Sequence, residues 1–74
     1  MMRRSSERMM KMNNEEIKAK VKEIRALTGL SQTKFAERYN IPRSTIRAWE
    51  LGTRKPPQWV LEMVEKIVRM DLLN

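Results

Sequence analysis

Two arginines four residues apart, Arg43 and Arg47, are the side chains of this 74-residue chain best suited to bind a ligand through paired hydrogen bonds. A guanidinium group is planar and charged, and it can donate two hydrogen bonds to O6 and N7 of guanine. Ser44 can bond to a base or a phosphate, and Ala48 can contact a thymine methyl group. On a helix these four residues share one side. The pattern therefore predicts a surface that contacts DNA bases.

A second set of polar residues suits the DNA backbone. Residues 53–55 follow the end of the same predicted helix, where the nearest acceptors would be phosphates. The Gln32 amide opens the preceding helix and can meet a phosphate, and Lys34 adds positive charge. Thr45 leans inward, so we expect it to be mainly structural and only secondarily a phosphate contact. The predicted phosphate-contacting residues are Gln32, Lys34, Thr45, Thr53, Arg54 and Lys55.

Two short helices and a tight turn would position these side chains. Ser31 is a suitable N-cap, and Phe35 and Tyr39 recur at helical spacing on one inward face. Asn40 tolerates the left-handed conformation of a tight exit, and Pro42 suits the first turn of the next helix.

The second of these helices is predicted from about Arg43 to Leu51, with Gly52 ending it. The side opposite the arginines is built to pack, because it carries Thr45, Ile46, Trp49 and Glu50.

The chain from about Glu15 to Ile67 resembles the phage-repressor-like (Xre, or Cro/CI) DNA-binding domains. The residues that carry the resemblance are Leu30-Ser31-Gln32, Phe35-Ala36, Ile41-Pro42, Thr45-Ile46, Trp49-Glu50, Gly52 and Arg54-Lys55-Pro56. Many members have Gly in place of Asn40 and Ser or Thr in place of Pro42. The resemblance implies an all-α, lambda-repressor-like domain of four to five helices, with the helix-turn-helix at helices 2 and 3. It also implies a transcription factor, most often a repressor, and a structural ion pair between Arg25 and Glu50.

The charge of the chain is consistent with a DNA partner. The formal net charge is +7, and residues 31–55 alone carry six basic and two acidic side chains. Basic composition by itself is a weak indicator, but basic residues on the outer face of a helix-turn-helix are a stronger one. We therefore predict double-stranded DNA as the partner.

Several function classes are disfavoured by composition. The chain has no cysteine and no histidine, which removes thiolate ligands, the commonest zinc ligand and the usual general base. We expect no enzyme activity, no metal and no cofactor. Apolar runs fall short of the roughly 20 residues of a membrane span, and no secretory signal is evident, so we expect a cytoplasmic protein.

Residues 1–12 read as a basic flexible tail, which could touch DNA as an arm, and residues 13–74 as the domain.

A first helix is predicted to begin at an Asn13 or Asn14 N-cap and to end at Gly29. The expected core comprises Ile17, Val21, Ile24, Leu27, Leu30, Phe35, Ala36, Tyr39, Ile41, Ile46, Trp49 and several residues of the stretch 59–67.

The last helix, predicted from about Pro57 to Leu72 with a possible short further segment at 70–73, is apolar around most of its circumference. A helix packed on one side needs an apolar arc only a little over about 100° wide. The surplus predicts a homodimer through Val60, Leu61, Val64, Val68 and Leu72. Two alternatives stay open: a fully buried central helix, and an antitoxin that binds a protein toxin through this helix as well as its own operator.

Overall fold

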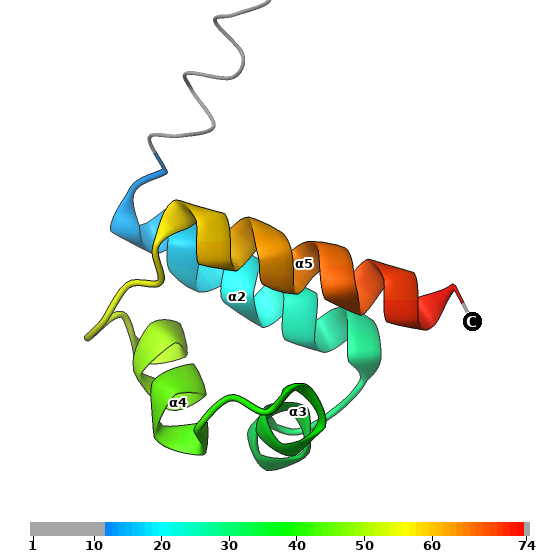
Figure 1. The fold of residues 1–74 in the computed structure, drawn as a ribbon. Helices are drawn as coiled ribbons and strands as arrows, with labels where there is room; N and C mark the ends of the chain where they lie inside the picture. The colour runs from blue at the N-terminus through cyan, green and yellow to red at the C-terminus, as the bar shows by residue number, and fades with distance from the viewer. Residues whose placement is uncertain (1–11, 74) are drawn as a thin grey trace, which may run out of the picture.

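The computed structural model describes residues 12–73, which form four helices and no strand (Figure 1). The helices are α2 (Asn14–Thr28), α3 (Gln32–Tyr39), α4 (Arg43–Leu51) and α5 (Gln58–Leu72). The all-α prediction is confirmed. Helix α5 runs unbroken to Leu72, so no separate segment forms at its end. Apart from Met12, the predicted basic tail lies outside the described residues.

Helices α2 and α3 begin, and helices α3 and α4 end, at capping residues that the sequence predicts. The Asn13 side chain accepts a hydrogen bond from the backbone N–H of Glu16 at 2.8 Å, and the Glu16 carboxylate accepts one from the Asn13 N–H at 3.0 Å. Ser31 Oγ accepts from the Lys34 N–H at 3.1 Å. These bonds satisfy donors that a helix start leaves without an intrahelical partner. Asn40 and Gly52 end α3 and α4 in the left-handed conformation, at φ 59° and 86°.

Helix α2 is the central element of the described domain. It packs against α3, α4 and α5, whereas the backbone of α5 approaches only α2 within residues 12–73. Figure 1 shows α5 running alongside α2, with α3 and α4 together on the other side. The helix-turn-helix pair and α5 therefore occupy different sides of the same central helix.

One core joins the four helices. Its buried apolar members are Ile17, Val21, Ile24, Phe35, Ala36, Ile46, Leu61 and Val68. Met12, which is partly buried, also packs against this core. Leu27 was predicted inside the core but is 39% exposed, near the C-terminal end of α2.

Two residues predicted for a dimer interface are instead buried within the domain. Leu61 is 4% exposed and Val68 is 0% exposed, so neither can contact another molecule while the fold is intact. Val60 and Val64 are partly buried, and only Leu72 of the predicted set is exposed. The apolar surplus of α5 is present, but it lies on a different side of the helix, at Trp59, Met63, Ile67 and Met70.

Candidate nucleic-acid interface

Helix α4 has one packed side and one exposed side. Ile46 is fully buried and Glu50 is 4% exposed. Arg43, Ser44 and Arg47 are exposed, and Ala48 is partly buried between them and the loop that follows. The helix is therefore held from within, and its arginines point away from the core.

A buried carboxylate ties α4 to its neighbours. Glu50 accepts a hydrogen bond from Arg25 Nε at 2.7 Å and another from Arg25 Nη2 at 3.1 Å. Arg25 Nη1 also donates to the Leu30 carbonyl oxygen at 3.0 Å. Arg25 lies on α2, so this bidentate pair connects the end of α4 to the central helix and to the start of the helix-turn-helix.

Gln32 faces a different group from the one predicted for it. Its Nε2 donates to Glu50 Oε1 at 3.1 Å, so the amide points toward the interior pair. A buried carboxylate needs several donors, which explains the inward turn. Burial raises the pKa of Glu50, but hydrogen bonds from Arg25 and Gln32 outweigh it, and the pKa lies below its ordinary value. Glu50 thus stays ionised and joins α2, α3 and α4.

The turn between α3 and α4 depends on Asn40. With φ 59° and ψ 42° this residue is left-handed, and the following N–H of Ile41 donates to the Ala36 carbonyl oxygen at 3.0 Å. Three residues, 40–42, separate the two helices, and α4 begins directly after Pro42. This places the first arginine of α4 directly after the turn.

The basic loop after α4 folds back over the end of that helix. The Ala48 carbonyl oxygen accepts from the N–H groups of Gly52 at 2.9 Å and Thr53 at 3.1 Å. Thr53, Arg54 and Lys55 are exposed, while Pro56 is buried and anchors the far end of the loop. The two cationic residues thus lie in an exposed loop that directly follows the end of α4.

Comparison with known families matches residues 21–70 to the family described as helix-turn-helix. The chain belongs to the phage-repressor-like helix-turn-helix family. It is accordingly a DNA-binding transcriptional regulator, and its partner is double-stranded DNA. No curated protein and no solved structure matches the chain.

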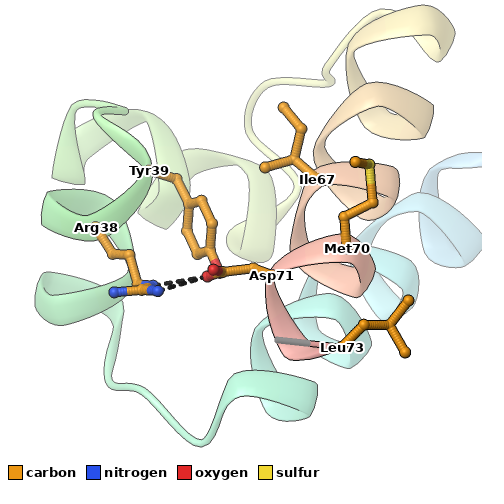
Figure 2. Close-up of a pocket in the computed structure, with 6 residues that line it drawn as sticks. All are labelled: Arg38, Tyr39, Ile67, Met70, Asp71 and Leu73. Carbon is orange, nitrogen blue, oxygen red and sulfur yellow. Dashed lines mark hydrogen bonds and ion pairs between the residues drawn. The ribbon is translucent and has the colours of Figure 1, made fainter.

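The helix-turn-helix domain also contains a polar cluster that the sequence did not reveal (Figure 2). Asp71 Oδ2 accepts from Arg38 Nε at 2.8 Å and from Tyr39 Oη at 2.8 Å. These hydrogen bonds, from Tyr39 first and then Arg38, lower the pKa of Asp71. The cluster fastens the last turn of α5 to α3. No sequence pattern links residues more than thirty positions apart, so only the fold could bring them together.

Within residues 12–73 of this helix-turn-helix domain, no helix is both long and apolar enough to cross a membrane. The same residues contain no group of three acidic side chains arranged to hold a metal ion.

Proposed function

We propose that this regulator is a sequence-specific repressor whose helix α4 enters the major groove of its operator. The observation that carries the proposal is the division of α4 into a buried side, with Ile46 and Glu50, and an exposed side with Arg43 and Arg47. The major groove distinguishes all four base pairs, and arginine reads guanine there with two hydrogen bonds. Ser44 and Ala48 lie on the same side and would contact neighbouring bases.

Phosphate contacts would come from the surroundings of α4. Arg54 and Lys55 are exposed in the loop beyond its end, and Lys34 is exposed on α3. Thr53 is exposed beside them, whereas Thr45 is partly buried and can offer only its hydroxyl. Gln32 already gives one amide hydrogen to Glu50, so it has one hydrogen left for a phosphate. Such contacts set position and supply the salt-dependent part of the affinity.

Selection of binding sites from random duplex DNA tests this proposal. We expect one enriched motif, with guanine at the positions that Arg43 and Arg47 read. The Arg47→Lys variant is a matched control, because it keeps the charge but loses the planar fork of donors. It should select a motif relaxed at one position and retain its affinity for random DNA. Recovery of no motif by the parent chain would contradict sequence-specific binding.

The direction of regulation needs a separate measurement. A selected operator placed across a promoter should lower reporter transcription when the protein is present, because a bound protein blocks access to the promoter. A variant lacking the base-reading arginines, Arg43→Ala with Arg47→Ala, should leave transcription unchanged. Increased transcription with the parent chain would contradict repression.

A further inference from the structure

An open hollow of about 720 Å³ lies where the last turn of α5 meets α3 (Figure 2). This volume is within the roughly 300–1,000 Å³ that small-molecule sites occupy. Helix α3 contributes Arg38 and Tyr39, and the end of α5 contributes Asp71. The other lining residues are apolar and exposed: Ile67, Met70 and Leu73. The hollow therefore combines a cation, an anion and an apolar wall, and none of its lining residues belongs to α4 or to the basic loop.

The ion pair in the hollow uses only one oxygen of its carboxylate. Asp71 Oδ2 accepts hydrogen bonds from Arg38 Nε and from Tyr39 Oη, each at 2.8 Å, and Arg38 Nη2 lies 2.7 Å from the same atom. Among residues 12–73, no donor reaches Asp71 Oδ1 and no acceptor meets Arg38 Nη1. A guanidinium has about five donors and a carboxylate about four acceptor positions. The pair therefore keeps both an acceptor and a donor for a ligand.

The charges of the hollow favour a ligand that carries both signs. Hydrogen bonding to Asp71 raises the pKa of Arg38, and hydrogen bonds from Tyr39 and Arg38 lower the pKa of Asp71, so both groups are ionised at neutral pH. A simple anion would be repelled by the free oxygen of Asp71, and a simple cation would be repelled by Arg38. A zwitterion avoids both costs, because it can present a carboxylate to one group and an ammonium to the other.

We propose that the hollow binds a free α-amino acid with an apolar side chain of about the size of leucine. The carboxylate of the ligand accepts hydrogen bonds from Arg38 Nη1, and its ammonium donates to Asp71 Oδ1. Both charged groups of an α-amino acid are attached to one carbon, which suits two protein groups that already contact each other. The side chain of the ligand packs on Ile67 and Met70, where it loses contact with water.

The anionic end of the site is held from the core of the domain. The Tyr39 ring lies 4.8 Å from the Phe35 ring, measured between centroids, and Phe35 is only 1% exposed. The Tyr39 hydroxyl in turn fixes one oxygen of Asp71, so the other oxygen has a defined position.

The openness of the hollow sets the expected strength. Ile67 is 46% exposed and Met70 is 60% exposed, so much of a bound ligand stays in contact with water. We therefore expect a dissociation constant in the millimolar range. Binding at the hollow requires neither DNA nor a second copy of the chain.

Nuclear magnetic resonance titration of the full chain with leucine and three analogues tests the proposal. Glycine lacks the apolar side chain, N-acetyl-leucine lacks the ammonium and leucine amide lacks the carboxylate. The last two also imitate the two ends of a peptide, so they separate a free amino acid from a chain terminus. We expect saturable shifts of the amide signals of Tyr39 and Met70 with leucine, and binding of each analogue at least about fivefold weaker.

Matched substitutions assign the binding to the hollow. Arg38→Gln should weaken leucine binding by about fivefold or more. Arg69→Gln is its control, because Arg69 also pairs with a carboxylate and its side chain is 53% exposed against 55% for Arg38. Met70→Gln should weaken binding too, whereas Leu51→Gln, at a position 59% exposed on α4, should not. Circular dichroism should show all four variants folded.

Three results would overturn the proposal. The first is a parent chain that shows no saturable shifts with leucine at the hollow. The second is an analogue that binds as tightly as leucine, since one of the three recognised groups would then be unused. The third is a control variant that weakens leucine binding as much as the variant it is matched to.

Discussion

Glu50, the most deeply buried charged residue of the described domain, receives both of its Arg25 hydrogen bonds from a different helix, at 2.7 and 3.1 Å. Because Glu50 lies one position before the end of α4, this pair holds the end of α4 against α2. Helix α4 therefore cannot rotate about its axis without breaking this pair. Its arginines stay on the exposed side as a result.

Removing one member of this pair should destabilise the domain more than removing a surface pair. Arg25→Met leaves a buried carboxylate with only the Gln32 amide, and we expect a loss of up to about 3 kcal/mol in unfolding free energy. Arg69→Met, which breaks an exposed pair with Glu65, should cost about 0–1 kcal/mol. Urea unfolding of both variants at low protein concentration compares them. Equal costs would mean that the Arg25 pair is only a surface contact.

Acid should destabilise the domain in a defined pH window. The folded pKa values of Glu50, Glu65 and Asp71 all lie below their ordinary values. Their contribution is therefore complete above the unfolded pKa values of about 4 and is lost as pH falls through the lower folded values. Unfolding free energy measured from neutral pH downward should be level and then fall below about pH 4. The Glu50→Gln variant should show a smaller fall, and stability that rises on acidification would contradict the assignment.

A leucine-to-alanine substitution should reduce the free energy of unfolding much more at a buried position of α5 than at an exposed one. Leu61→Ala removes a side chain that is 4% exposed and should cost about 2–5 kcal/mol through lost burial and a cavity. Leu72→Ala, at a position 50% exposed, should change stability by less than about 0.5 kcal/mol. Thermal unfolding at a single low concentration measures both. Similar costs for the two variants would contradict the orientation of α5 described above.

Replacing Asn40 by glycine should cost less stability than replacing it by alanine. Its φ of 59° places a β-carbon in a conformation that costs roughly 1–2 kcal/mol for most residues. Asn40→Ala should therefore lose about 1 kcal/mol, whereas Asn40→Gly should stay within about 0.5 kcal/mol of the parent. Denaturant midpoints give both values. A stable alanine variant would show that the turn relaxes out of the left-handed region.

The sequence was sufficient for features set by neighbouring residues. Helix caps and left-handed turns depend on a few adjacent side chains, so the sequence predicts where the helices begin and end. The residues at these positions are Asn13, Ser31, Asn40 and Gly52. The helix-turn-helix and its exposed arginines follow from the same local signals.

Features set by distant residues were predicted less well. Helix α5 is apolar on most sides, so its periodicity could not tell which side meets α2, and Leu61 and Val68 were placed outside. The Asp71 cluster with Arg38 and Tyr39 depends on how α5 passes α3, which no local pattern records. The inward turn of Gln32 likewise depends on a carboxylate 18 positions away.

The most direct test of base reading by α4 compares Arg47→Ala and Lys55→Ala on operator and scrambled duplexes across a salt series. Arg47→Ala should cost about 1–3 kcal/mol on the operator and little on scrambled DNA, because base edges carry the sequence information. Lys55→Ala should weaken both duplexes alike and lower the slope of log affinity against log salt by about 1. Equal losses on both duplexes for Arg47→Ala would show that Arg47 contacts only phosphate, and would contradict the assignment of this side of α4 to sequence recognition.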